Sequence, residues 1–173
     1  MKRIIGVVSL VILMALSGHK SMAQNFKFAH INSDELVQAL PEFDTARVQL
    51  EKFQKELVNA LELMQVELRN KVDVYQKESK NYTDIVRNTK EQEMNDMNTR
   101  IQEFQQNAQA QLQEKQSSLF QPIYAKVDKA IKDVGKENGF VYVFDVAKGS
   151  LLYFDETKST NIMNLAKAKL GVK

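Results

Sequence analysis

The sequence predicts a predominantly helical α+β fold, in which a long antiparallel helical hairpin projects from a small β body. The first observation is a stretch without glycine between Gly18 and Gly135, where average glycine usage near 7% would place about eight. The second is a pair of apolar stripes with helical spacing, one on each side of a polar centre. The third is the position of strand-like segments near both ends of this stretch, within 26–31 and 140–154. A helical region this long must fold back on itself or self-associate.

The first 23 residues have the features of a cleaved signal peptide. Lys2 and Arg3 precede an apolar run from Ile4 to Leu16, and the small residues that end at Ala23 fit a cleavage site. A retained membrane anchor is the alternative, but the run is shorter than the roughly 20 residues of a spanning helix. The chain has no cysteine, so neither a lipidated cysteine nor a disulfide is available to it. We therefore expect an exported protein whose mature region is 24–173.

The mature region is nearly neutral. Cleavage removes three of the 24 basic residues and none of the 22 acidic residues, so the net charge falls from +2 to about −1. A whole-surface attraction to nucleic acid or to anionic lipid is therefore not expected, and we predict no nucleic-acid partner.

The segment that precedes the hairpin predicts one strand and one short helix. Large and smaller side chains alternate from Phe26 to Ile31, which indicates a strand. Ser33 is well placed to cap a helix that ends at Leu40, and Pro41 then starts the chain in a new direction.

The hairpin is expected to span 43–136. In each arm, apolar residues recur at steps of three and four, which is typical of a narrow amphipathic helix. Two such stripes can pack against each other as the seam of an antiparallel coiled coil. The first arm contributes Phe43, Ala46, Leu50, Phe53, Leu57, Leu61, Met64, Leu68, Val72 and Tyr75. The second contributes Met94, Met97, Ile101, Phe104, Ala108, Leu112, Leu119, Ile123, Val127, Ala130 and Val134, with Lys115 as the one polar interruption.

The position of the turn follows from symmetry. A hairpin of two equal arms would reverse between Asn81 and Thr89, where polar residues cluster, and Thr89 with Gln92 would form a capping box for the returning helix. Arms of roughly 40 residues would reach about 60 Å at 1.5 Å per residue. Such arms would project from the body.

The C-terminal part predicts two more strands and a helix. The run Phe140–Phe144 indicates a strong strand, 147–150 a turn, 151–154 the returning strand and 160–170 a final helix. With 24–42, the segment 137–173 would form the body of a single domain. Three strands and two short helices are too small a core to stand alone, so we expect the sheet to be completed between subunits.

These features, in this order, resemble the Skp/OmpH family of periplasmic chaperones. The resemblance covers essentially the whole mature region and rests on four segments, 32–43, Gln121–Val127, Asn138–Asp145 and Leu152–Asp155. The most specific of them is the Pro-Ile-x-x-Lys-Val element that begins at Pro122.

The resemblance implies a periplasmic homotrimer with an intersubunit β body and three helical arms. The arms would enclose a cavity that holds unfolded outer-membrane β-barrel proteins until insertion, without ATP. The better-known members are strongly basic, whereas this mature region is nearly neutral, so lipopolysaccharide or anionic lipid is not expected to be an obligatory partner. The alternative from another functional class is a coiled-coil spacer or adaptor of the cell envelope, but such a spacer would not need strands on both sides of the hairpin.

Three groups of residues are candidate binding positions. Leu63, Val66 and Val74 lie 180° to 260° away from the seam on a helical wheel and could contact client chains, although scattered surface residues or a subunit contact would give the same pattern. A modestly basic arm tip could touch membrane or lipopolysaccharide, or simply be a solvated face; its residues are Lys77, Lys80, Arg87 and Lys90. The expected subunit contacts of the body are Phe26, Phe28, Val141, Val143, Leu152 and Phe154.

The sequence does not suggest an enzyme. The mature region has one histidine, His30, within a predicted strand, where a core or interface role is more common than general-base catalysis. No phosphate-binding loop, metal-ligand spacing or nucleophile motif is present in the sequence. We therefore expect no catalytic residues, no metal and no cofactor.

Overall fold

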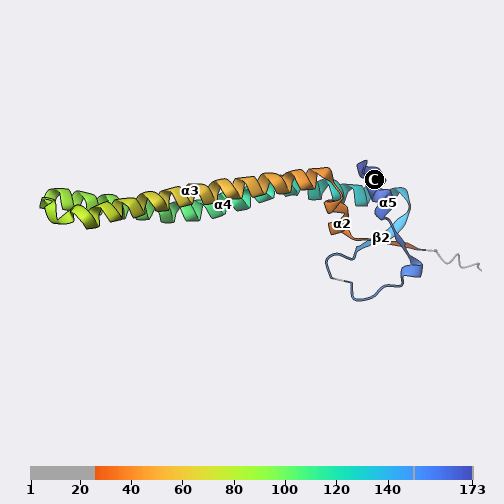
Figure 1. Cartoon of the computed structure of the whole chain (residues 1–173). Helices are drawn as coiled ribbons and strands as arrows, with labels where there is room; N and C mark the ends of the chain where they lie inside the picture. Colours follow the sequence, from red (N-terminus) through yellow and green to blue (C-terminus); the bar gives the residue numbers. More distant parts are fainter. Residues whose placement is uncertain (1–25, 150, 173) are drawn as a thin grey trace, which may run out of the picture.

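The computed structural model describes residues 26–149 and 151–172, and the predicted signal peptide at 1–23 lies outside them. A long two-helix arm projects from a small body that contains both ends of the described chain (Figure 1). This is the predicted α+β fold. In chain order the elements are β1 (Lys27–Ile31), α2 (Ser33–Gln38), α3 (Pro41–Glu78), the 3-10 turn η1 (Ser79–Asn81), α4 (Asp84–Glu137), β2 (Phe140–Asp145), the 3-10 turn η2 (Glu156–Lys158), β3 (Ser159–Asn161) and α5 (Met163–Leu170).

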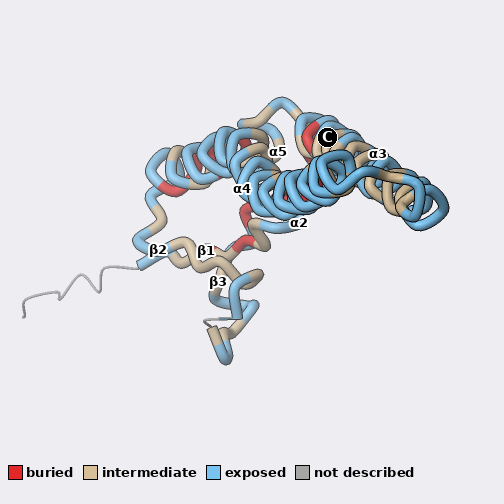
Figure 2. The backbone as a smooth tube through the Cα atoms, turned by 90° about the vertical axis from the view of Figure 1, so that its left-hand side faces the viewer, coloured by how far each residue is buried: buried red, intermediate tan, exposed pale blue. Residues whose placement is uncertain are grey.

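The two apolar stripes form the contact between α3 and α4. Every residue of both predicted stripes is buried or half-buried, whereas most of the remaining arm surface is exposed (Figure 2). The Lys115 interruption is accommodated because its Nζ lies 6.0 Å from the ring centroid of Phe53, a cation–π distance. The predicted seam is thus confirmed.

The turn at the arm tip lies earlier than symmetry predicts. Thr83, not Thr89, is the N-cap of α4, and its side chain accepts a hydrogen bond from the Val86 amide. Thr89 lies inside the helix and donates to the Ile85 carbonyl, so the predicted capping box is wrong. The two arms are unequal, 38 residues in α3 and 54 in α4, because the last turns of α4 belong to the body.

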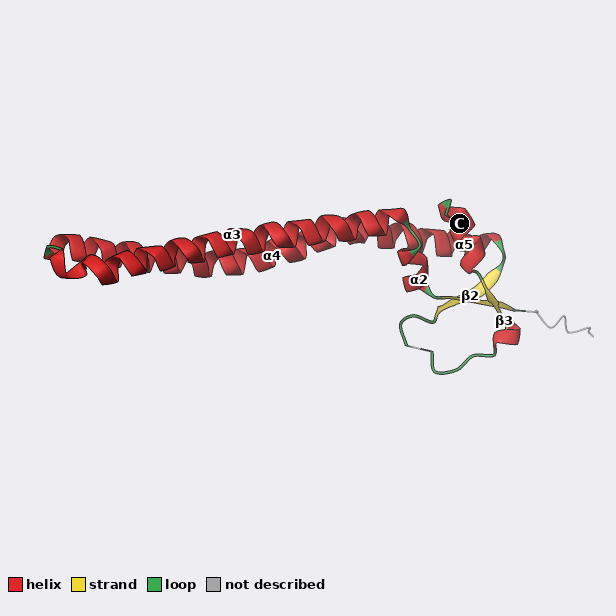
Figure 3. Ribbon diagram, viewed as in Figure 1, coloured by secondary structure: helices red, strands yellow, loops and turns green. Residues whose placement is uncertain are grey.

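The three strands form one parallel sheet in the order β2-β1-β3 (Figure 3). The chain leaves β1, runs out along α3, returns along α4 and therefore enters β2 in the same direction as β1. The predicted returning strand at 151–154 is wrong, since the third strand is formed by Ser159–Asn161. The carboxylate of Asp145 accepts a hydrogen bond from the Ala147 amide, so the chain bends away directly after β2.

The core of the body lies between the sheet and the helices. Alternation along β1 buries Ala29 and Ile31 on the helix side, and the end of α4 packs closely on β2. A Cβ at Gly135 would lie 3.3 Å from a methyl of Val143, tighter than ordinary contact. The other members of this buried cluster are Leu36, Val37, Leu40, Ala46, Ile123, Val127, Val134, Ile162, Met163 and Ala166.

Hydrogen bonds to the Asp145 carboxylate connect the end of β2 to the start of α2. The N-cap of α2 is Asn32 rather than the predicted Ser33. Ser33 instead donates from its amide to Asp145 Oδ1 (3.1 Å) and from its hydroxyl to Oδ2 (2.5 Å). The final helix likewise begins later than predicted, at Met163.

Replacing Asp145 with alanine is expected to destabilise the body by about 1 kcal/mol, because the Ser33 donors lose a charged acceptor. Partial burial raises the pKa of Asp145, but hydrogen bonds from Ser33 and Ala147 outweigh it and hold the pKa below the usual 3.8. A lowered pKa contributes stability that is present above the unfolded-state pKa and is lost as the pH falls through the folded-state pKa. Urea unfolding at neutral and acid pH measures the free energy of unfolding of wild type and variant. We expect the difference between these two free energies to be smaller at acid pH. Asp155→Ala, which removes only bonds local to its turn, is the matched control.

Candidate functional site

The predicted off-seam residues of α3 are exposed. Leu63 is 71% exposed, Val66 38% and Val74 50%. The structure does not gather them into one pocket, and they are spread along the arm. Val74 lies beside the seam, at a groove of about 290 Å³ that the seam residues Tyr75 and Met94 also line. The geometry is that of a long surface with separated aliphatic contact points.

Other aliphatic side chains of the arm are also exposed and were missed by the sequence reasoning. Val48 and Val58 of α3 are 58% and 56% exposed, and Ile85 at the arm tip is 81% exposed. Helical phase could have found Val48, because it lies 18 residues, or five turns, before Val66 and so shares its face. Helical phase could not have found Ile85, because the sequence predicts that this residue lies in the turn between the two helices.

The four basic residues of the predicted tip patch occupy three elements. Lys77 lies in the last turn of α3, Lys80 lies in η1, and Arg87 and Lys90 lie in the first two turns of α4.

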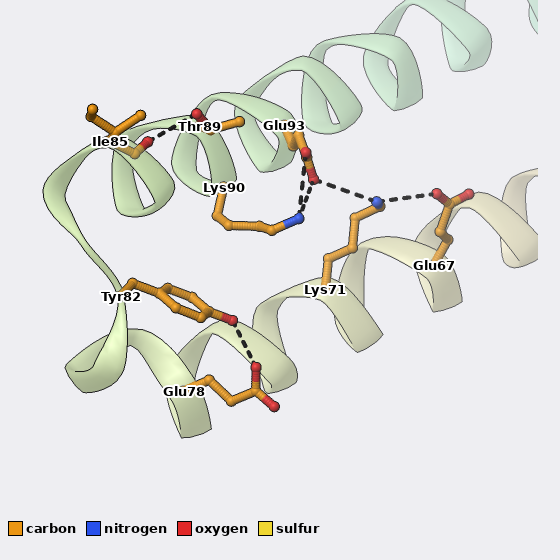
Figure 4. A network of polar contacts seen from close by, with 8 residues as sticks. All are labelled: Glu67, Lys71, Glu78, Tyr82, Ile85, Thr89, Lys90 and Glu93. Atoms are coloured by element: carbon orange, nitrogen blue, oxygen red, sulfur yellow. Dashed lines mark hydrogen bonds and ion pairs between the residues drawn. The ribbon is translucent and has the colours of Figure 1, made fainter.

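Acidic side chains alternate with these cations. Lys90 Nζ lies 3.2 Å from a Glu93 oxygen, and Glu93 also approaches Lys71 at 3.9 Å (Figure 4). Tyr82 donates to Glu78 at 2.9 Å, and Tyr75 donates to Glu91. These hydrogen bonds raise the pKa of both tyrosines above the usual 10. The tip is therefore a mixed-charge surface around an exposed Ile85.

One face of the sheet is aromatic. The rings of Phe28 and Tyr142 stack with centroids 6.3 Å apart, and Tyr142 lies 6.0 Å from Phe144. His30 packs on Phe154 at 4.7 Å. We call these five residues the aromatic face. The helices α2, α4 and α5 lie on the opposite side of the sheet (Figure 2), and Tyr142 is 60% exposed.

The predicted subunit-contact residues fall in four different environments. Phe28 and Phe154 belong to the aromatic face, and Val143 packs against the core of its own chain. Val141 is 48% exposed and lines an open groove of about 800 Å³ between α2, α4 and β2. Phe26 and Leu152 project from the body, at 56% and 100% exposure.

The side chain of His30 takes part in a hydrogen bond within the sheet. His30 Nδ1 lies 2.9 Å from the Ser159 hydroxyl, which links β1 to β3.

Within residues 26–149 and 151–172, no cluster of three or more His, Cys, Asp or Glu side chains could hold a metal ion. Across the same residues, no helix has the length and the apolar character needed to cross a membrane.

The described residues thus form a long two-helix arm with exposed aliphatic side chains, joined to a small body whose sheet has one aromatic face. The family is shown by sequence: the chain belongs to the family described as outer membrane protein (OmpH-like), whose model matches residues 27–170.

The fold is also that of a solved protein. The structure is similar to that of a candidate outer membrane chaperone (OmpH-like) from Caulobacter crescentus, with a TM-score of 0.71 over 90% of this chain and 89% of the other. The sequences are 12% identical, so this likeness concerns the fold alone. A search of curated proteins returned no match.

Proposed function

We propose that this protein is an ATP-independent periplasmic holdase chaperone that binds unfolded outer-membrane proteins between helical arms and keeps them soluble for insertion. The observation that carries the proposal is the set of exposed aliphatic side chains of α3, since the seam does not require them. Membership of the OmpH-like family and the fold shared with a candidate outer membrane chaperone support it.

The spacing of these residues suits a holdase. Leu63, Val66 and Val74 are separated by charged and polar residues such as Glu67 and Asp73, so each offers a small apolar contact. Many weak contacts along a surface bind varied extended chains without trapping any of them. Release would then follow from the folding or membrane insertion of the client, and no nucleotide would be needed.

We further propose that the protein assembles as a homotrimer through its body. The aromatic face is half-exposed, and β2 and β3 are both edge strands, which natural proteins usually cover or protect. The body alone has a small core. Phe28, Phe154 and the projecting Leu152 are the proposed subunit contacts, and the groove beside Val141 would be covered in the same assembly.

Contact of the arm tips with membrane or lipopolysaccharide is the remaining part of the proposal. Lys77, Lys80, Arg87 and Lys90 would supply the attraction and Ile85 an apolar contact. Because Glu93 pairs with Lys90 and acidic residues alternate with the cations, the contact would be weak and would be screened by salt.

The test of the proposed function uses the purified mature protein without ATP and an unfolded outer-membrane β-barrel diluted from urea. Light scattering measures whether the barrel stays soluble, and insertion into added vesicles measures whether it is released in a competent state. Aggregation at the rate seen without the protein would contradict the holdase proposal and favour an envelope spacer or adaptor.

The combined change Leu63→Ser, Val66→Ser and Val74→Ser is expected to weaken capture of the barrel with little change in melting. Surface substitutions usually alter stability by within about 0.5 kcal/mol each, whereas the lost apolar contacts act directly on the client. The matched control replaces exposed polar residues of the same helix, Gln49, Asn59 and Gln76, with serine. Equal capture by parent and variant would remove these residues from the binding surface.

Ile101→Ala provides the opposite control. Ile101 is buried in the seam, so its truncation is expected to cost about 2 kcal/mol or more while leaving the outer side of α3 unchanged.

A further inference from the structure

Glutamines are concentrated in one segment of α4. Eight of the 15 glutamines of the chain lie between Gln102 and Gln121. Charged residues are sparse in the same segment: they are three of its 20 residues, Glu103, Glu114 and Lys115, against 27% of the whole chain. Protein surfaces that only need to be soluble usually carry a larger share of charged side chains. The composition of this segment therefore needs another explanation.

Four of these glutamines form a row on the side of α4 that faces away from the seam. At about 100° per residue, they lie about 120° to 220° around the helix from the seam residue Ala108. We call them the amide row: Gln102, Gln106, Gln113 and Gln121. All four are exposed, and the row is about 28 Å long at 1.5 Å per residue.

The amide row is available for contacts with another molecule. Among the described residues, none of the four side chains has a hydrogen-bond or ion-pair partner. By contrast, the Gln92 amide nearer the arm tip donates to Asp96 at 2.7 Å. The small side chain of Ala110 interrupts the row and borders an open hollow of about 560 Å³ that Gln113 and Gln121 also line. A bound chain could approach the helix closely at this hollow.

The chemistry of the row matches that of a polypeptide backbone. Each glutamine side chain carries an amide with two N–H donors and an oxygen acceptor. An extended unfolded chain presents one backbone N–H and one C=O at nearly every residue, with a rise of about 3.3 Å per residue. Urea, which also carries amide groups, solvates both peptide groups and apolar groups of unfolded chains. Neutral amides thus suit a partner that is recognised by its backbone rather than by its charge.

We propose that the amide row binds the unpaired backbone of unfolded client chains. The inference rests on the proposed function and names the chemical group of the client that is recognised. A closed β-barrel pairs all the backbone groups of its strands but keeps an apolar band on its outer surface. Aliphatic contacts such as Leu63 could therefore bind the barrel before and after folding, whereas the amide row loses its ligand when the strands pair. The row would make release follow from folding of the client.

Two peptides that differ only in their backbone test the proposal. The first is a fluorescent peptide of about ten residues in which leucine and serine alternate, the pattern of a barrel strand. In the second, N-methyl groups replace the N–H hydrogens of the serines, so the side chains are unchanged and those donors are lost. Fluorescence anisotropy measures the affinity of the mature protein for each peptide. We expect the unmodified peptide to bind about fivefold more tightly, which corresponds to one net hydrogen bond of about 1 kcal/mol.

Replacing the whole amide row with methionine is expected to abolish this preference. Methionine has nearly the length and the helix propensity of glutamine but lacks the amide, so both peptides should bind the variant with equal affinity. The matched control makes the same substitution at four exposed glutamines of α3, which do not form a row, and is expected to keep the preference. The control positions are Gln49, Gln54, Gln65 and Gln76.

Equal affinity of the parent for the two peptides, or no binding of either, would overturn the proposal. A preference that survives in the methionine variant of the row, or that is lost equally in the control, would also overturn it. If the row variant instead changed the sedimentation of the protein, the row would contact a second copy of the chain rather than a client. Circular dichroism checks that each variant retains its helices.

The peptide measurement and the barrel assay can fail separately. A protein that keeps the β-barrel soluble but binds both peptides equally would refute only the role of the amide row. A protein that prefers the unmodified peptide but does not keep the barrel soluble would refute only the proposed holdase function.

Discussion

Val143→Asp is expected to unfold the body. Val143 packs against the buried cluster of its own chain, and a Cβ at Gly135 would already lie 3.3 Å from its methyl group. A carboxylate at this position would lose the apolar contact with the core and place a charge beside Gly135, at the inner edge of the open groove that Val143 also lines, at a cost of about 3 kcal/mol. That is a large part of the roughly 5–15 kcal/mol that stabilises a typical domain. Urea unfolding followed by circular dichroism and intrinsic tyrosine fluorescence measures the loss.

Tyr142→Asp is the matched control because Tyr142 neighbours Val143 in β2 but lies on the aromatic face and is 60% exposed. We expect this variant to retain its secondary structure and to lose the proposed trimer, which sedimentation measures. If Val143→Asp instead gave a stable, helical monomer, Val143 would be a subunit contact rather than a core residue. If Tyr142→Asp kept the mass of a trimer, the aromatic face would not be the assembly surface.

The arm was predictable because its determinants are local. One apolar residue per turn specifies which side of each helix is buried, and neither helix needs information from the rest of the chain. Every stripe residue is accordingly buried or half-buried. The turn was misplaced because the prediction assumed equal arms, whereas α4 continues into the body. Nothing near Thr83 or Thr89 shows from sequence alone which of them ends the loop.

The sheet was only partly predictable because strand pairing is not local. The sequence indicates β1 and β2 correctly, but the turn-like residues 147–150 suggested an antiparallel neighbour for β2. In the structure the helical arm reverses the chain and brings β2 beside β1 in parallel, and the short strand Ser159–Asn161 pairs with the other edge of β1. A three-residue strand of polar residues has no hydrophobic pattern that could predict it.

The candidate binding surface was also only partly predictable from the sequence. Helical phase placed Leu63, Val66 and Val74 off the seam, and their exposure agrees with that geometry. Their role in client binding stays a prediction. Ion pairs across the arm, such as Lys71 with Glu93, depend on the register of α3 against α4, which no single helix encodes.

Shortening both arms is expected to abolish most client holding while the body remains folded and assembled. The contacts Phe53–Lys115 and Tyr75–Glu91 define the register of the arms. In that register, deletion of 55–72 and 94–111 removes opposite segments of equal length. Each deletion removes five turns, so the seam keeps its helical phase and the arm shortens by about 27 Å. The native tip around Thr83 is retained, while Leu63 and Val66 are lost with the removed surface.

The body is expected to survive this change because its core residues come from the chain ends and from the last turns of α4, and the contacts of the seam are local along the arm. Sedimentation measures assembly, and light scattering of a diluted β-barrel measures holding. A control deletion of one segment alone, 55–72, breaks the register and is expected to destabilise the whole arm. If the doubly shortened protein dissociated, the arms would be the assembly element and an envelope coiled coil would explain the chain better. If it held the barrel as well as the parent, the removed part of the arm, with Leu63 and Val66, would be dispensable for client holding.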